Sequence, residues 1–212
     1  MISKELKRRI TTSIVLITIV LFCLFFNALS WLFLLTIVSL ICWHEFISLS
    51  KKIWKNKTVI ILPITASFLL LVLFLYTSYK LKIVRGDEAV LFVFLVCIFS
   101  DIGGYFVGKS VGGRKLTKIS PNKTISGSIG SFLFSLFPIV IIFILQEKNI
   151  NFNIILLCLI LSFSCQIGDL IISYFKRMAR VKDTGSILPG HGGMLDRIDG
   201  IIFAIPTLIP FL

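Results

Sequence analysis

Hydrophobic residues dominate the chain in a series of long runs that are separated by short basic stretches. A helix that spans a bilayer needs roughly 20 mostly apolar residues. The last run is short and contains Pro206 and Pro210, so we expect a tilted or partial span there. The pattern predicts an all-α, polytopic transmembrane helical bundle of about seven spans. The predicted spans are residues 10–26, 31–50, 58–79, 88–107, 125–145, 153–175 and 198–212.

Composition agrees with a membrane environment for most of the chain. Hydrophobic residues make up 57% of the 212 residues, and the mean hydropathy is +1.00. This is too apolar for one soluble core to bury. The first apolar run is followed almost directly by a second, which favours a signal anchor or a helical hairpin over a cleaved signal peptide.

The basic residues predict how the spans are oriented. The chain carries 22 Lys and Arg against 10 Asp and Glu, a net charge of +12. If the N-terminus is cytoplasmic, the basic residues on the opposite side are only Lys80, Lys82, Arg85 and Lys148. Cytoplasmic loops are enriched in Lys and Arg. This asymmetry therefore predicts that the N-terminus and the basic loops 108–124 and 176–197 face the cytoplasm.

The first part of the chain, residues 1–86, has its charges mainly at the ends of apolar runs. Long basic side chains at such positions reach the lipid headgroups, which is typical of scaffold spans. His44 and Glu45 lie near the end of the second run, and we expect them at the membrane interface, because polar residues at span ends cost little.

The second part, residues 87–212, has carboxylates inside its apolar runs. Asp101 lies within the fourth run and Asp169 within the sixth. A carboxylate at membrane depth costs about 2 to 3 kcal/mol and is normally turned toward a polar interior. A structural ion pair with Lys or Arg of a neighbouring helix is the alternative. We predict one membrane domain in which residues 87–212 form the catalytic part.

Residues 173–199 gather most of the remaining polar residues in the segment S-Y-F-K-R-M-A-R-V-K-D-T-G-S-I-L-P-G-H-G-G-M-L-D-R-I-D. Its basic side chains can neutralise phosphate, and its glycines let backbone N–H groups approach phosphate oxygens. If Asp196 begins a helix, Asp199 lies on the same face and the two can share a divalent cation, for which oxygen ligands select Mg²⁺ or Mn²⁺. This combination indicates phosphoryl or nucleotidyl transfer. Anchoring to anionic lipid alone would explain only the basic residues.

This segment resembles the signature of the phosphatidate cytidylyltransferase, or CDP-diacylglycerol synthase, family, which reads S-x-F-K-R-x4-K-D-x4-[LF]-P-G-H-G-G-x-x-D-R-x-D. The similarity is uninterrupted from Ser173 to Asp199. Two further segments look like family elements. The loop S-P-x-K-T-x-x-G is matched by Ser120, Pro121, Lys123, Thr124 and Gly127, with Ile125 and Ser126 where W-E is usual. The element D-x-x-A-Y-x-x-G is matched by Asp101, Tyr105 and Gly108, with Gly104 where Ala is usual.

The resemblance implies the residues of the site. The family's metal-binding acids correspond to Asp169 and Asp196, with Asp199 as a further ligand or a carboxylate beside the ligands, and the cofactor would be Mg²⁺, as one cation or two. A lone charge is unfavourable at both Asp169 and Asp196, so we predict that they converge on one metal that bridges the nucleotide. Lys176 and Arg177 complete the catalytic set. The implied substrate-binding residues are Ser120, Lys123, Thr124, His191, Gly192, Gly193 and Arg197.

The resemblance also implies an activity, which is transfer of the cytidylyl group of CTP to phosphatidic acid, giving CDP-diacylglycerol and pyrophosphate. Such an enzyme would be a multi-pass protein of the inner, cytoplasmic membrane, with its active site facing the cytoplasm. CTP, phosphatidic acid and membrane lipid would be its partners, without nucleic acid, and a homodimer is left open. A related CTP-dependent enzyme acting on another lipid phosphate or a lipid alcohol is one alternative. A transporter with carboxylates at the bilayer midplane is another.

Overall fold

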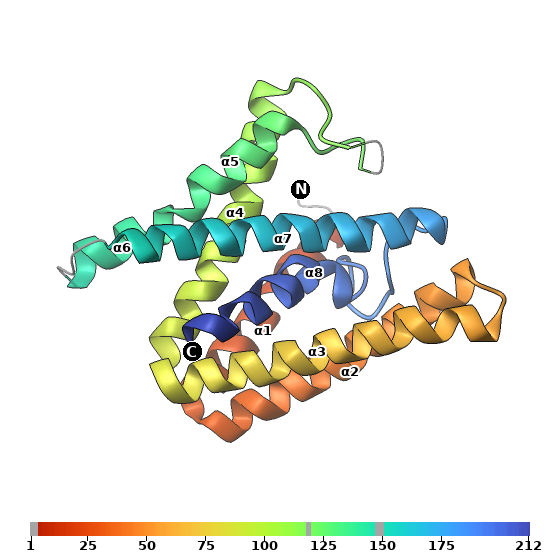
Figure 1. Ribbon diagram of the computed structural model, residues 1–212, viewed down its shortest axis with the longest axis horizontal. Helices are drawn as coiled ribbons and strands as arrows, with labels where there is room; N and C mark the ends of the chain where they lie inside the picture. The colour runs from red at the N-terminus through yellow and green to blue at the C-terminus, as the bar shows by residue number, and fades with distance from the viewer. Residues whose placement is uncertain (1–3, 118–119, 147–150) are drawn as a thin grey trace. The chain divides into compact units, whose positions relative to one another are not determined.

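The computed structural model describes residues 4–117, 120–146 and 151–212, and the regular elements of these ranges are helices. Lys148 and residues 118–119 of the predicted basic loop lie outside the described residues. The all-α fold class is confirmed. In chain order (Figure 1), the elements are α1 (Lys4–Phe26), α2 (Ala28–Ile53), α3 (Lys57–Arg85), α4 (Asp87–Val111), α5 (Ile125–Ser135), α6 (Phe137–Gln146), α7 (Phe152–Met178), α8 (Leu195–Ala204) and the 3-10 helix η1 (Ile205–Phe211).

Among the residues that the structure describes, five helices, α1, α2, α3, α4 and α7, are long and apolar enough to cross a membrane, so the chain has the fold of a multi-pass membrane protein. The predicted fifth run is divided instead into the short helices α5 and α6. Pro138 explains this division, because proline has no N–H to donate and its ring crowds the preceding turn. The seventh run contains α8 and η1, and η1 includes Pro206 and Pro210. The exact span count and the orientation remain predictions.

The chain forms two compact units, which are described separately. The first unit consists of Met1–Asp87 and Phe175–Ile198, and the second of Glu88–Tyr174 and Asp199–Leu212. The first unit therefore holds most of the signature segment together with the amino-terminal helices. The division into a scaffold part and a catalytic part stays a prediction.

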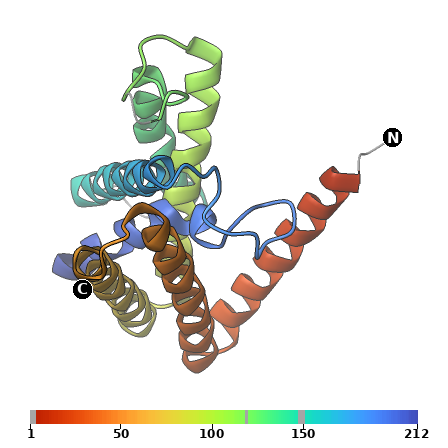
Figure 2. The same ribbon diagram turned by 90° about the vertical axis from the view of Figure 1, so that its right-hand side faces the viewer.

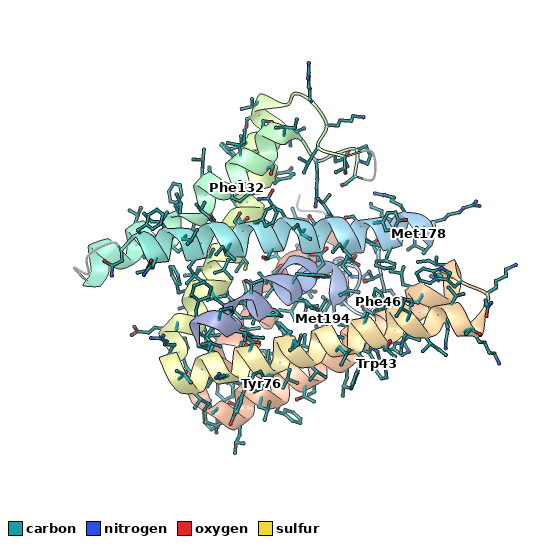
Figure 3. All side chains as sticks on the ribbon, in the orientation of Figure 1. Trp43, Phe46, Tyr76, Phe132, Met178 and Met194 are labelled. Carbon is teal, nitrogen blue, oxygen red and sulfur yellow. The ribbon has the colours of Figure 1, made fainter. Side chains whose placement is uncertain are left out.

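In the first unit, the amino-terminal helices form two successive hairpins. Asn27 separates α1 from α2, and its side-chain oxygen accepts a hydrogen bond from the Ser30 amide at 2.6 Å. Figure 2 shows α1 diverging from α2 after this turn, whereas α2 and α3 run side by side in Figure 1. Aromatic side chains line the second hairpin, where the rings of Trp43 and Phe68 lie 5.3 Å apart (Figure 3).

In the second unit, glycines bring α4 and α5 into backbone contact. A Cβ atom added at Gly127 would lie only 2.7 Å from the carbonyl oxygen of Gly104, and one added at Gly130 would lie 2.7 Å from that of Gly103. Small residues allow such close approach of helices in membranes. The glycines of the two shorter family-like elements therefore have a packing role in this chain.

Two adjacent glycines of α4 are expected to respond differently to the same substitution. In Gly103→Ala, the new methyl group would lie 2.5 Å from the Gly130 carbonyl oxygen, and backbone cannot easily move. In Gly104→Ala, it would meet the Ser131 hydroxyl, which can rotate because the Ser131 Cβ lies 3.9 Å away. We expect Gly103→Ala to cost about 1 to 3 kcal/mol and Gly104→Ala to cost little. The melting temperatures of wild type and both variants, measured in the same detergent, check this expectation. Equal destabilisation by the two substitutions would contradict the described packing.

Candidate active site

The signature loop, residues 179–194, connects α7 to α8 and lies in the first unit. Gly190 and Gly192 adopt φ values of +77° and +86°, in the left-handed region that favours glycine. The loop closes on itself because the Leu188 amide donates to the Gly192 carbonyl at 2.9 Å, and the His191 amide donates to the Leu188 carbonyl at 2.9 Å. The P-G-H-G-G segment is therefore a tight, internally bonded turn.

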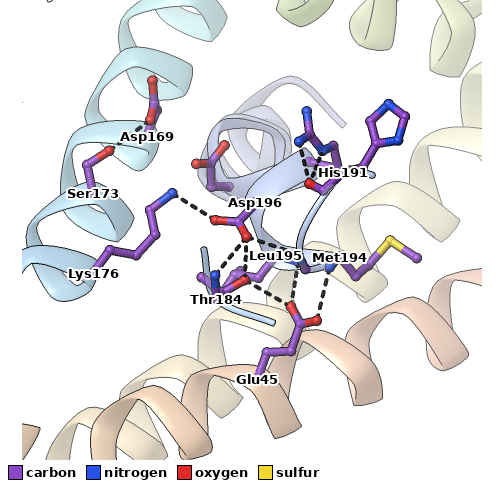
Figure 4. A network of polar contacts seen from close by, with 12 residues as sticks. Glu45, Asp169, Ser173, Lys176, Thr184, His191, Met194, Leu195 and Asp196 are labelled. Atoms are coloured by element: carbon purple, nitrogen blue, oxygen red, sulfur yellow. Dashed lines mark hydrogen bonds and ion pairs between the residues drawn. The ribbon is translucent and has the colours of Figure 1, made fainter. Parts of the chain in front are cut away.

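Asp196, in the first turn of α8, is the centre of the polar network in Figure 4. One of its oxygens accepts a hydrogen bond from the Lys176 ammonium group at 2.8 Å. The other accepts from the Thr184 amide at 2.7 Å, the Thr184 hydroxyl at 3.0 Å and the Gly193 amide at 3.0 Å. The carboxylate thus joins α7, both ends of the signature loop and α8.

These contacts also set the charge state of Asp196. Burial by itself would raise the pKa of the carboxyl group, but the hydrogen bond and positive charge of Lys176 and the amides of Thr184 and Gly193 outweigh it, and the pKa lies below its ordinary value. The side chain is therefore ionised at neutral pH.

Glu45 also belongs to this network, which the sequence did not predict. Only 3% of Glu45 is exposed, whereas we expected it at the membrane interface. Its carboxylate accepts hydrogen bonds from the Met194 amide at 3.0 Å, the Leu195 amide at 2.8 Å and the Thr184 hydroxyl at 3.1 Å. The signature loop covers this part of α2, and the position of Glu45 relative to the membrane interface stays a prediction. The available signal was a carboxylate inside an apolar run, as at Asp101 and Asp169.

The turn of the signature loop rests on α1, as Figure 2 shows. The His191 imidazole Nε2 lies 3.1 Å from the Ser13 hydroxyl, and the Thr12 hydroxyl donates to the Pro189 carbonyl at 3.2 Å. The Arg197 guanidinium donates through Nε to the His191 carbonyl at 3.0 Å. His191 and Arg197, both predicted to bind substrate, thus have contacts that stabilise the turn.

The second unit brings together two residues that lie far apart in the sequence. The Lys123 ammonium group is 2.5 Å from a carboxylate oxygen of Asp169. The Ser173 hydroxyl donates to the other oxygen at 3.2 Å (Figure 4). This is the ion pair that we considered as the alternative for a carboxylate inside a span. The Asp169 side chain is 35% exposed, so the ion pair does not bury it.

The loop that carries Lys123 is held by its neighbours. The Lys123 amide donates to the Ser120 carbonyl at 3.1 Å, and its own carbonyl accepts from the Leu116 amide at 2.8 Å. Thr124 precedes α5, and its hydroxyl accepts from the Gly127 amide at 3.0 Å as a helix cap. Ser120 and Thr124, predicted as substrate-binding residues, therefore also position Lys123.

Two further carboxylates of the second unit lie against α7 near Asp169. Asp101 accepts a contact from the Cys165 thiol, with the two atoms 3.6 Å apart. A Cβ atom added at Gly168 would lie 2.7 Å from the carbonyl oxygen of Asp199, so the backbone of Asp199 touches α7 directly beside Asp169. Asp169 and Asp199 therefore come from neighbouring segments of one unit.

The carboxylates differ in how well they suit a divalent cation. Among the described residues, no group of three or more His, Cys, Asp and Glu side chains is placed to hold a metal. Mg²⁺ often needs only one or two carboxylates, because water and substrate phosphates supply the other oxygens. Asp169 and Asp199 lie on contacting segments of one unit, which makes them candidates for such a site. The two oxygens of Asp196 already face four donor groups, against two for those of Asp169, so Asp196 suits a cation less.

Asp169 and Asp196 belong to different units, and their convergence on one metal stays a prediction. Of the predicted basic residues, Lys176 is engaged with Asp196, whereas Arg177 is exposed at the end of α7. Arg180 and Lys182 of the signature loop are exposed as well. The first unit therefore offers cationic side chains at the surface of the loop.

The fold and these side chains define a class: a polytopic, all-α membrane protein that pairs carboxylates with basic residues in each of its two units. The chain belongs to the cytidylyltransferase family, whose profile matches residues 71–212. Helices α1 and α2 lie before the matched residues.

Curated relatives agree with this assignment. The chain is 48% identical over 126 residues to a phosphatidate cytidylyltransferase of Staphylococcus haemolyticus (strain JCSC1435), covering 58% of this chain and 48% of the relative. It is 46% identical over 126 residues to that of Staphylococcus aureus (strain N315), with the same coverage. It is 39% identical over 142 residues to that of Brucella suis biovar 1 (strain 1330), covering 64% of this chain and 53% of the relative. The chain spans about half the length of the curated relatives it matches.

Proposed function

We propose that the chain transfers the cytidylyl group of CTP to phosphatidic acid and so makes CDP-diacylglycerol and pyrophosphate for phospholipid biosynthesis. The observation that carries the proposal is the 39% to 48% identity with relatives named phosphatidate cytidylyltransferase. The polar networks around Asp169 and Asp196 support it. Each network pairs a carboxylate with a lysine, Lys123 for Asp169 and Lys176 for Asp196.

In this reaction, a phosphate oxygen of phosphatidic acid attacks the α-phosphorus of CTP, and the bond from that phosphorus to the oxygen bridging the β-phosphate breaks. Pyrophosphate leaves with the bonding electrons. The nucleophile is already an anion, so the protein needs no strong base. It must align the two phosphates and neutralise their charge.

We propose separate roles for the residues of each unit. Lys123 and Arg177 would bind phosphate oxygens, with Arg180 and Lys182 adding positive charge at the loop. Asp169 and Asp199 would hold Mg²⁺, which supplies charge neutralisation on the triphosphate when bound. Asp196 and Lys176 would keep the signature loop in the arrangement that presents the glycine turn.

A labelled nucleotide tests the proposal. Purified full-length chain should convert CTP labelled at the α-phosphate into a lipid-soluble product only when phosphatidic acid is present, with release of pyrophosphate. An enzyme that phosphorylates a lipid alcohol would instead transfer label from the γ-phosphate. Other lipid phosphates, supplied in place of phosphatidic acid, distinguish a sister enzyme. Absence of lipid labelling by a folded protein, with either nucleotide, would refute the proposal.

We also propose that the chain resides in the inner membrane of a bacterium with its site facing the cytoplasm, where CTP is supplied. The basic-residue asymmetry supports this orientation. Reporter fusions at Lys115 and Lys182 should both report the cytoplasmic side. A fusion at Arg85 is the control and should report the opposite side. If Lys115 and Lys182 report different sides, the predicted number of spans between them is wrong.

A further inference from the structure

Glu45 is a buried carboxylate that the proposed reaction does not use directly, and it lies outside residues 71–212 matched by the family profile. We infer that Glu45 is a positioning residue, which holds the amino end of α8 and the signature loop in the arrangement that cytidylyl transfer requires. The inference rests on the proposed function for its effect on rate. Its structural part can be tested without any activity.

The contacts of Glu45 require a carboxylate. Its two oxygens accept hydrogen bonds from three donors, namely the Met194 amide, the Leu195 amide and the Thr184 hydroxyl. The first amides of a helix have no partner within the helix, and a negative charge is favourable there. Met194, which precedes α8, has no side-chain oxygen to cap them. Glu45 therefore supplies from α2 the cap that the local sequence lacks.

Glycines of the signature loop make room for this carboxylate. A Cβ atom added at Gly193, the last glycine of the H-G-G turn, would lie 2.6 Å and 2.8 Å from the two Glu45 oxygens. A Cβ atom added at Gly185 would lie 2.5 Å from one of them. The Thr184 hydroxyl would lie closer still to that Cβ atom, so the side chains of Glu45 and Thr184 together leave room only for glycine at Gly193.

Thr184 links Glu45 to Asp196. Its hydroxyl lies 3.1 Å from a Glu45 oxygen and 3.0 Å from an Asp196 oxygen. A hydroxyl group has one proton, so it can serve either carboxylate, while the Thr184 amide remains bonded to Asp196. A change at Glu45 is thereby transmitted to the carboxylate at the centre of the network, without any contact between Glu45 and substrate.

The substitution Glu45→Gln tests the inference, because it keeps the volume but turns an amide group toward N–H or O–H donors. We expect amide hydrogen exchange in residues 183–196 to accelerate about tenfold or more, with exchange in α3 unchanged. In the CTP assay, kcat/KM should fall by about the same factor. Glu88→Gln, the same change at an exposed glutamate at the start of α4, is the control and should alter neither result.

Glu45→Asp separates a capping role from simple packing. Aspartate keeps the charge and loses a methylene group, whereas glutamine keeps the volume and loses the charge. If Glu45 acts as a cap, Glu45→Asp should retain more protection and more kcat/KM than Glu45→Gln. The opposite order would overturn the inference and indicate that only the volume matters.

The remaining outcomes are also decisive. Unchanged exchange in residues 183–196 of Glu45→Gln overturns the inference, and so does unchanged kcat/KM in an active enzyme. If Glu45→Gln does not fold, Thr184→Val removes the shared hydroxyl with little change in shape, and faster exchange in the same segment is expected. Unchanged exchange there overturns the inference. A wild-type chain that never labels lipid would refute the proposed function, while the exchange result would still support or overturn the capping role.

Discussion

Replacing Asp169 or Asp199 with Asn is expected to lower lipid labelling from CTP by about two orders of magnitude or more, with the protein still folded. Asn keeps the shape of the side chain and removes the charge that a divalent cation needs. Both residues lie in the second unit on neighbouring segments, and Asp169 is partly exposed. Each variant should require more Mg²⁺ for half-maximal rate. The double variant should lose little more than either single one, because the first change already removes the metal.

Wild-type activity should be lost on treatment with EDTA and restored by Mg²⁺ or Mn²⁺, since the available ligands are carboxylate oxygens. Ser173→Ala removes a hydrogen bond to Asp169 and keeps its charge, so it should raise the Mg²⁺ requirement less than Asp169→Asn does. Full activity after exhaustive chelation would exclude the metal role. Losses that multiply in the double variant would show that the two carboxylates act independently.

Asp196→Asn is expected to destabilise the protein strongly as well as lower its activity. The change breaks the ion pair with Lys176. It also turns the NH₂ group of Asn toward N–H donors, such as the amides of Thr184 and Gly193, that bind the carboxylate in the wild type. Removing one partner of a buried ion pair costs about 3 kcal/mol or more, and the Asp196 and Lys176 side chains are only 5% and 15% exposed. The melting temperature of Asp196→Asn should therefore lie several degrees below that of wild type. The Mg²⁺ requirement of this variant, measured on its residual activity, should stay near that of wild type.

Asp183→Asn is the matched control for stability, because Asp183 is an exposed aspartate of the same loop. It should leave the melting temperature close to that of wild type. If Asp196→Asn is instead as stable as wild type and needs more Mg²⁺, then Asp196 is a metal ligand, as the sequence analysis predicts. The two measurements together therefore decide between a structural carboxylate and a ligand.

The fold class and most of the spanning helices could be predicted from the order of residues alone. In a bilayer every backbone group must find its partner within the segment, so a long apolar run can only be helical. This is why the runs at 10–26, 31–50 and 58–79 correspond closely to α1, α2 and α3. The signature segment could be read directly for the same kind of reason, since its residues are contiguous and their chemical types alone indicate phosphate binding.

The contacts among these residues, in contrast, could be identified only in the folded chain. Glu45 contacts Leu195, 150 positions later in the chain, and Lys123 contacts Asp169 across two helices and a loop. No local pattern encodes such pairs, because they depend on how helices pack and on where glycines leave space. The same holds for Asp196. Its chemical type suggests a metal ligand, but the four donor groups around its carboxylate favour a role in holding the signature loop. Residue type thus indicated the kind of chemistry. The burial and the hydrogen-bond partners of each carboxylate exist only in the folded chain, and so they could not be predicted from the sequence.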